Sequence, residues 1–165
     1  MPAVTAYIGL GANLGDASGA LRQAVEAIGR LPHTRLGTRS SLYATAPVIS
    51  GAPGDSSRPP DPAYVNAVLE VQTRLSPVDL LAALQAIETA AGRERPYHHA
   101  PRTLDLDLLF YGNLQLTSPE LTVPHPRLYA RAFVLVPLAE IARSLVSSAQ
   151  LKAVADQRVE RIGAL

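Results

Sequence analysis

The sequence predicts an α+β fold in which helices pack on one face of a mainly antiparallel sheet. Two amphipathic helical patterns alternate with strand-like segments in the order strand, helix, strand, strand, helix, strand. Each helical pattern is bounded by start and stop signals, and the last strand alternates acidic with apolar residues. This order is the split βαβ arrangement. An open, doubly wound sheet is the alternative.

The first part of the chain supplies two strands, a helix and a long loop. Val4 to Leu10 is an apolar strand that ends in a glycine-rich turn. A helical pattern follows Asp16 and stops near Gly29 to Pro32. Arg35 to Tyr43, rich in Thr, Ser and Tyr, is the expected second strand. Ala44 to Pro62 is rich in Pro, Gly and Ser, and such long loops often serve as lids.

The middle of the chain completes the pattern. Tyr64 to Thr73 is the third strand. Ser76 to Asp79 combines an N-cap serine, a proline at the first helical position and an acidic residue, and the helix it opens ends at Gly92. Arg93 to Pro101 is a second irregular segment, and Leu104 to Tyr111 is the fourth strand.

The end of the chain carries shorter elements. Leu121 to Val123 is extended, Pro124 to Pro126 forms a turn, and a helical stretch surrounds Phe133 to Ile141. An amphipathic stretch follows. No internal repeat is visible, and 165 residues with 47% apolar content form one domain, residues 1–165.

Charge and cysteine content exclude several classes of protein. With 15 basic and 14 acidic residues the net charge is +1, which argues against a nucleic-acid or membrane-surface partner. The chain has no cysteine and therefore no disulfide or thiolate metal site, which fits a cytoplasmic location. Lys152 is the one lysine. Phosphate must therefore be bound by arginine, backbone amides or metal.

The sharpest motif is the pair Asp105 and Asp107 on the fourth strand. Side chains alternate along a strand, so both carboxylates project from one face, about 7 Å apart at roughly 3.4 Å per residue. Close carboxylates repel each other unless a cation lies between them, and Mg²⁺ prefers such oxygen ligands. The alternative is a solvated strand face.

Arginines flank the acidic pair. Arg93, Arg95 and Arg102 beside a two-carboxylate site favour transfer of a phosphorus group, because their guanidinium groups bind phosphate oxygens. A screened surface patch is the alternative. The adjacent pair His98 and His99 lacks the spacing of a helical zinc site.

Other motifs are less specific. His125 lies between two prolines, which suits either a placed polar side chain or an ordinary turn. The first glycine-rich turn differs from a dinucleotide-binding motif because Leu14 stands where the third glycine is required. No glycine-rich turn is followed by lysine, which excludes a Walker motif. The first turn is therefore expected to be structural.

The chain closely resembles the 6-hydroxymethyl-7,8-dihydropterin pyrophosphokinase family. The matching motifs occur in the family's order up to about Ile141: Ile8 to Asp16, Tyr43 to Pro47, Tyr64 to Ala67, Ile87-Glu88 with Gly92-Arg93, Pro101 to Asp107, Val123 to Pro126, and Arg131 to Phe133. The resemblance implies a ferredoxin-like fold and transfer of pyrophosphate from ATP to the hydroxymethyl group of the pterin, with AMP released, in folate biosynthesis.

The resemblance also assigns roles to individual residues. Asp105 and Asp107 would hold two Mg²⁺ ions, and Arg93 and Arg102 would bind the transferring group. The residues implied for the pterin are Thr45, Val48, Tyr64, Asn66 and Phe133. Those implied for ATP are Gln85, Glu88, Arg95, His99, Thr122, His125 and Arg131. A monomer with these two small-molecule substrates is expected.

The chain departs from the family pattern at three places. His99 stands where well-known members carry a tryptophan, so either this histidine or His98 is expected to clamp the ligand. Glu120 stands where some members carry arginine. The segment 93–102 is a residue shorter than in some members and the loop 47–64 is longer. Both irregular segments are expected to close over bound substrates.

Two other functions are compatible with the residues alone. A different Mg-dependent nucleotidyl- or glycosyl-transferase could use Asp105 and Asp107. A non-enzymatic ferredoxin-like regulatory domain would not need two acidic residues flanked by arginines on one strand.

Overall fold

The computed structural model describes residues 2–13, 16–45, 64–92 and 104–165. The helices and strands of the first half are β1 (Val4–Ala12), α1 (Ala17–Gly29), β2 (Thr34–Arg39), β3 (Ser41–Thr45), β4 (Tyr64–Thr73) and α2 (Pro77–Gly92). Those of the second half are β5 (Asp105–Tyr111), β6 (Leu116–Thr117), β7 (Thr122–Val123), α3 (Ala132–Ile141), α4 (Ser148–Ala153) and β8 (Val159–Ala164). Short 3₁₀ helices cover Leu128–Ala130 and Arg143–Leu145.

The main sheet has the strand order β5-β1-β4-β3-β8, and β2 also pairs with β4. Every pair of neighbouring strands in the described part of this sheet is antiparallel. The order β5-β1-β4-β3, with β1 and β4 at the centre, is that of a ferredoxin-like sheet. The expected α+β fold is therefore confirmed, and the doubly wound alternative is wrong.

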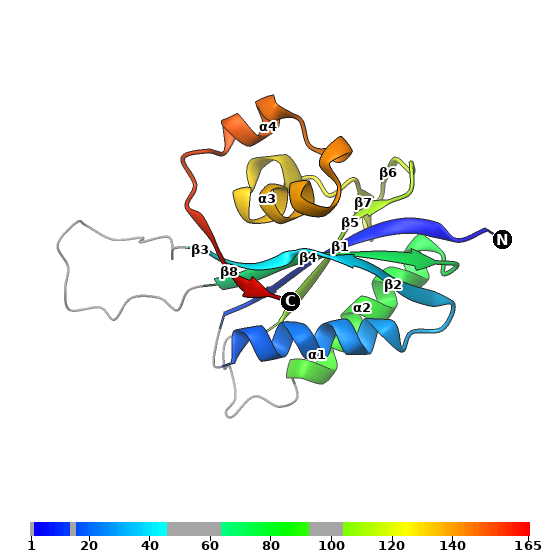
Figure 1. The fold of residues 1–165 in the computed structure, drawn as a ribbon. Coiled ribbons are helices and arrows are strands. Elements are labelled where there is room, and N and C mark those ends of the chain that lie inside the picture. Colours follow the sequence, from blue (N-terminus) through cyan, green and yellow to red (C-terminus); the bar gives the residue numbers. More distant parts are fainter. Residues whose placement is uncertain (1, 14–15, 46–63, 93–103) are drawn as a thin grey trace.

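The sheet has helices on both sides (Figure 1), and a hydrophobic core lies on each of its faces. The larger core lies between the sheet and helices α1 and α2, and includes Ile8, Leu21, Leu69 and Leu84. The smaller core lies on the other face, under α3 and α4, and includes Leu135. The expectation that helices cover one face holds for α1 and α2 alone, because the apolar helix α3 covers the other face.

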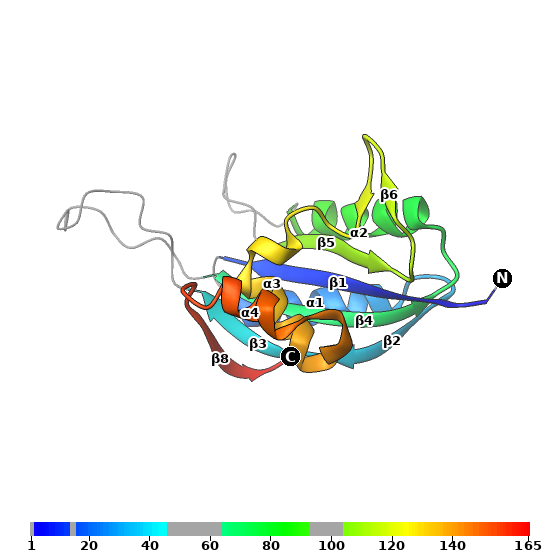
Figure 2. The same cartoon turned by 90° about the horizontal axis from the view of Figure 1, so that it is seen from above.

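The two long helices begin as the sequence predicts. The Asp16 carboxylate accepts a hydrogen bond from the backbone N–H of Gly19 at 2.9 Å and caps α1. In front of α2, the Ser76 hydroxyl accepts one from the N–H of Asp79 at 3.1 Å. Both helices cross the face of the sheet opposite α3, as Figure 2 shows from above.

The predicted second strand is divided at Ser40. Its hydroxyl donates to the carbonyl of Ser41 at 2.8 Å and accepts from the N–H of Val68 at 2.8 Å. A side chain thus replaces part of the backbone ladder. The resulting strands β2 and β3 both pair with β4.

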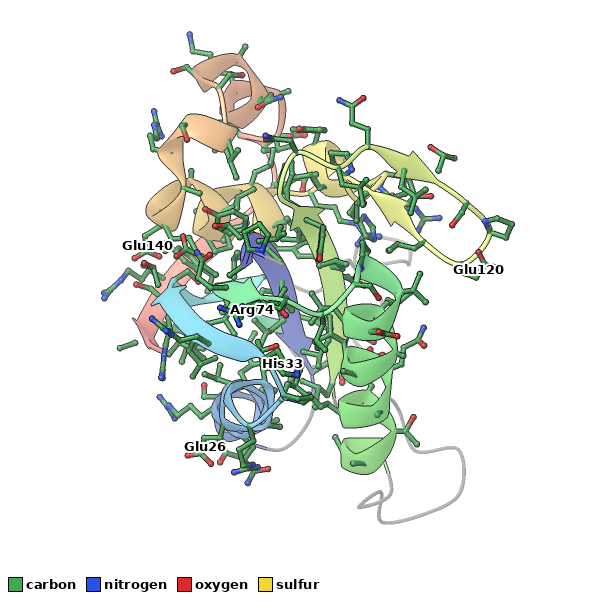
Figure 3. All side chains as sticks on the ribbon, turned by 90° about the vertical axis from the view of Figure 1, so that its right-hand side faces the viewer. Glu26, His33, Arg74, Glu120 and Glu140 are labelled. Atoms are coloured by element: carbon green, nitrogen blue, oxygen red, sulfur yellow. The ribbon has the colours of Figure 1, made fainter. Side chains whose placement is uncertain are left out.

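The C-terminal stretch forms α4 and the edge strand β8, which pairs with β3. A polar network lies at this edge: the Glu140 carboxylate accepts from the N–H and the hydroxyl of Ser41, both at 2.7 Å, and from the Tyr43 hydroxyl at 2.9 Å. Arg161 of β8 donates to the Ser41 hydroxyl at 2.8 Å. Figure 3 shows Glu140 at the end of the molecule opposite Glu120, which lies at the tip of β6 and β7.

This network changes the protonation behaviour of its members. Burial, and then the hydrogen bond to Glu140, raise the pKa of Tyr43 to about 12. Burial alone would raise the pKa of Glu140, but the hydrogen bonds from Ser41 and Tyr43 and the charge of Arg161 hold it below its ordinary value.

Among the described helices, none is long and apolar enough to cross a membrane.

Candidate active site

The aspartate pair lies at the start of β5, on the face of the sheet that α3 partly covers. Asp105 and Asp107 are half-buried, and the intervening Leu106 is buried in the larger core. The expected alternation is therefore confirmed. Both carboxylates belong to one strand face, which leaves them accessible while the leucines stabilise the fold.

Two glycines of β1 lie directly beside the aspartates. Gly9 pairs with Asp107 and Gly11 pairs with Asp105. On the other side of β1, Gly11 also pairs with Asn66 of β4. The strand that separates the acidic pair from Asn66 thus carries no side chain at these two positions. The side chains of neighbouring strands lie close to both positions: Leu109 against Gly9 and Asn66 against Gly11.

Gly11 has a steric role that the sequence did not indicate. A Cβ atom at this position would lie 2.9 Å from the Asn66 side-chain oxygen, closer than side chains normally approach. The glycine-rich stretch, interpreted from sequence as a structural turn, is therefore partly strand, and Gly11 lets Asn66 lie against β1.

Asn66 carries a buried, unsatisfied donor. The residue is 6% exposed, and its side-chain Nδ2 has no hydrogen-bond partner among the described residues. Leaving such a group unpaired costs free energy, and a bound ligand with an acceptor would recover it. Asn66 therefore fits the wall of a polar ligand site.

Asn13, at the end of β1, is a site residue that sequence reasoning did not single out. Its Oδ1 is likewise buried with no partner in the part of the chain that the structure describes, while its Nδ2 donates to the Tyr64 hydroxyl at 3.3 Å. The unpaired oxygen is an acceptor, complementary to the unpaired donor of Asn66. The signal in the sequence that could have identified it is its position directly after Gly11 and Ala12, within the motif Ile8 to Asp16.

Thr45 and Tyr64 lie together at the adjoining ends of β3 and β4. They are paired in the sheet, and the Thr45 hydroxyl donates to the Tyr64 carbonyl at 3.4 Å. The Tyr64 side chain is 43% exposed, so its ring is available for stacking.

At the start of α3, the N-cap residue Arg131 lies over an aromatic ring. The Arg131 guanidinium carbon lies 5.4 Å from the centroid of the Phe133 ring, within cation–π range. The structure thus joins a residue implied for ATP with one implied for the pterin.

His125 interacts electrostatically with Asp107 and with this arginine. Burial first, and then the charges of Arg131 and Arg127, lower its pKa, whereas the charge of Asp107 acts to raise it. Its Nδ1 accepts a hydrogen bond from the N–H of Arg127 at 3.2 Å. His125 therefore has an acidic and two basic side chains as electrostatic neighbours.

The remaining described candidates lie around β5. The Glu88 carboxylate of α2 accepts a hydrogen bond from the N–H of Leu106 at 3.0 Å, between the two aspartates along the strand. Thr122 is in β7, which contacts β5. Gln85 is exposed on α2, one turn before Glu88, and its backbone carbonyl accepts from the Thr89 hydroxyl.

The donor set fits magnesium bound together with a substrate. No group of three or more His, Cys, Asp or Glu side chains that could enclose a metal occurs within the described ranges. Mg²⁺ commonly uses one or two carboxylates and takes its other ligands from water and phosphates. Asp105 and Asp107 are two carboxylates of this kind on one strand face.

Several predicted site residues lie outside the described residues. These are Val48, Arg93, Arg95, His98, His99 and Arg102. The same holds for most of the 44–62 loop and for the 93–101 segment. Their predicted clamping and closure stay predictions.

Comparison with known proteins gives a consistent result. A family described as 7,8-dihydro-6-hydroxymethylpterin-pyrophosphokinase matches residues 7–143. A Pseudomonas aeruginosa protein named 2-amino-4-hydroxy-6-hydroxymethyldihydropteridine pyrophosphokinase is 46% identical over 139 residues, covering 84% of this chain and 81% of that protein. A Bacillus subtilis protein of the same name is 40% identical over 144 residues, covering 87% and 81% of the two chains.

Solved structures support the fold. A crystal structure described as HPPK-DHPS in complex with substrates superposes with a TM-score of 0.67 at 12% identity, over 94% of this chain and 45% of that chain. A Plasmodium falciparum HPPK-DHPS structure gives a TM-score of 0.60 at 15% identity, over 84% and 39% of the two chains. The match over residues 7–143, together with the relatives' identity, establishes that the chain belongs to the 7,8-dihydro-6-hydroxymethylpterin-pyrophosphokinase family.

Proposed function

We infer that the protein transfers pyrophosphate from ATP to the hydroxymethyl group of 6-hydroxymethyl-7,8-dihydropterin, a step of folate biosynthesis. The observation that carries this inference is the family match over residues 7–143, supported by two relatives, each 46% identical, that are named as pyrophosphokinases. Membership favours this enzyme over a different transferase or a non-enzymatic regulatory domain.

The reaction makes one bond and breaks one. The hydroxymethyl oxygen attacks the β-phosphorus of ATP and loses its proton, and the bond from that phosphorus to the oxygen bridging the α- and β-phosphates breaks. The β- and γ-phosphates move together, and AMP leaves. Such transfers are accelerated mainly by positioning the reactants and by stabilising charge on the phosphate oxygens.

Asp105 and Asp107 are proposed as the metal ligands of this centre. Their shared strand face beside Gly9 and Gly11 is the support for this role. Two Mg²⁺ ions bound there would supply positive charge to the phosphate oxygens. Arg93 and Arg102 are proposed to bind the transferring group through their guanidinium groups.

The pterin is proposed to bind on the other side of the glycine strand. The unpaired Nδ2 of Asn66 would donate to an acceptor on the ring edge. Tyr64 and Phe133 offer aromatic faces for stacking, while Thr45 and Val48 complete the proposed set.

ATP is proposed to bind along the acidic side of the site. His125, which interacts electrostatically with Asp107 and with Arg131, would face its phosphates together with Arg131. The other proposed contacts are Gln85, Glu88, Arg95, His99 and Thr122. A monomeric, cytoplasmic enzyme is proposed, and gel filtration of the purified chain with light scattering tests the first property.

The released nucleotide tests the function directly. Incubation with ATP, Mg²⁺ and 6-hydroxymethyl-7,8-dihydropterin should yield AMP in equal amount to pyrophosphorylated pterin, because the β-phosphorus is attacked. Chromatography of the products measures both. Omission of the pterin or addition of EDTA should abolish AMP formation, and ADP as the main nucleotide would contradict the inference.

Gly11→Ala should weaken pterin binding selectively. The new methyl group would displace the Asn66 carboxamide, whose oxygen lies 2.9 Å from the Cβ position. The pterin KM should rise about tenfold, the effect of about 1.4 kcal/mol, while the ATP KM changes little. Steady-state kinetics with each substrate varied measures this.

Gly163→Ala is the control for this substitution. Gly163 is also a strand glycine, in β8, and a Cβ there would meet no atom within 4 Å. Its kinetics should match wild type. An unchanged pterin KM in Gly11→Ala would show that the close approach of Gly11 and Asn66 has no part in binding.

A further inference from the structure

Gln157 connects the C-terminal part of the chain to the start of α3. It lies between α4 and β8, beyond the residues 7–143 that match the family. Its side-chain Oε1 accepts a hydrogen bond from the N–H of Ala132 at 2.9 Å. Its Nε2 donates to the carbonyl of Ala130 at 2.8 Å. One carboxamide therefore binds the backbone on both sides of Arg131.

These two bonds satisfy backbone groups that local structure leaves open. Ala132 is the first residue of α3, where N–H groups have no partner within the helix. The preceding residue, Arg131, provides no side-chain cap. Gln157 thus performs the capping function from a distant part of the chain, in place of the usual Ser, Thr, Asp or Asn.

The segment that carries Gln157 is itself anchored at both ends. Val154 before it is 3% exposed and belongs to the smaller core. Val159 after it begins β8 and pairs with Thr45 of β3. Because both ends are held, the position of the Gln157 carboxamide is defined relative to the sheet.

We propose that Gln157 is a positioning residue, which fixes the backbone around Arg131 and thereby orients the Arg131 and Phe133 side chains for substrate binding. Those side chains are stacked with 5.4 Å between the guanidinium carbon and the ring centroid. This inference rests on the proposed function, because it takes Arg131 as an ATP residue and Phe133 as a pterin residue.

The test compares Gln157→Met and Gln157→Glu with Gln150→Met in the full chain. Methionine keeps the length of the side chain but forms neither hydrogen bond. Glutamate keeps an acceptor for the N–H of Ala132 but places a second oxygen against the Ala130 carbonyl. Gln157→Glu should therefore raise KM less than Gln157→Met does. Gln150 is the matched control, since its side chain also bonds to backbone, accepting from Ser147 at 2.8 Å, but within the cap of α4.

The expected result is a change in affinity that exceeds the change in stability. Gln157→Met should raise the KM of both substrates roughly two- to tenfold, the range that one such hydrogen bond supports, with a smaller change in kcat. Amide hydrogen exchange at Ala132 should become faster. Gln150→Met should leave KM and this exchange rate as in wild type, although its Tm falls similarly.

Two outcomes would overturn the inference. Both Gln157 variants could show wild-type KM values despite faster exchange at Ala132. They could also lose kcat and Tm together at constant KM, which would indicate general support of the fold. Failure of the wild-type chain to form AMP in the same assay would instead refute the proposed function.

Discussion

Asp105→Asn and Asp107→Asn are each expected to lower kcat about a thousandfold or more while the protein remains folded. Loss of one charged group from a preorganised phosphoryl-transfer centre removes several kcal/mol of transition-state stabilisation. Both side chains are half-buried on a strand face opposite the leucines of the larger core. Substitution should therefore leave that core intact. Steady-state AMP release measures kcat, and thermal unfolding measures stability.

Glu26→Gln provides the comparison for this loss of negative charge. Glu26 is exposed on α1, on the side of the sheet away from α3 (Figure 3). It should show wild-type turnover. Turnover near wild type in both aspartate variants at ordinary Mg²⁺ would show that the pair is a solvated strand face, as the alternative interpretation of the sequence holds.

Asn66→Ala is expected to raise the pterin dissociation constant about 10- to 100-fold, corresponding to roughly 1.4 to 2.8 kcal/mol for a lost buried hydrogen bond. The effect should be confined to the pterin, because the donor without a partner lies across the glycine strand from the acidic pair. The folded protein should not be strongly destabilised, since this Nδ2 makes no hydrogen bond to any described residue that the change would remove. Equilibrium binding of pterin and of an ATP analogue measures the two affinities.

Gln72→Ala is a control on the same strand. Gln72 lies six residues further along β4 and exchanges side-chain hydrogen bonds with Thr5 at 2.8 and 3.1 Å. Its loss should lower stability without altering pterin affinity. Equal pterin affinity in Asn66→Ala and wild type would exclude Asn66 from the pterin site.

Local signals predicted the elements that position the site. The alternation of aspartates and leucines after Leu104 identified β5, because each residue type has one favourable face. The Ser76-Pro77 start identified α2, because its capping bond forms within four residues. Both predictions depend on neighbouring residues alone.

Features that depend on distant partners could not be predicted in the same way. Strand β8 has mostly exposed side chains and becomes a strand by pairing with β3. The contact between Gly11 and Asn66 depends on the register of β1 against β4, over a separation of 55 residues that no local pattern encodes. For the same reason, the hydrogen bond between Gln157 and the start of α3 could not be predicted from local sequence.

The position of β8 also bears on how the protein resists aggregation. Without β8, the backbone groups of β3 would form an open sheet edge, which can pair with another chain. The edge that β8 presents in its place carries Glu160 and Arg161, and its pairing with β3 is irregular between Leu42 and Tyr43. Charge and irregularity both oppose further strand addition. Truncation before Val159 would therefore remove β8 and expose the edge of β3 to pairing with other chains. Loss of solubility would accompany any loss of activity.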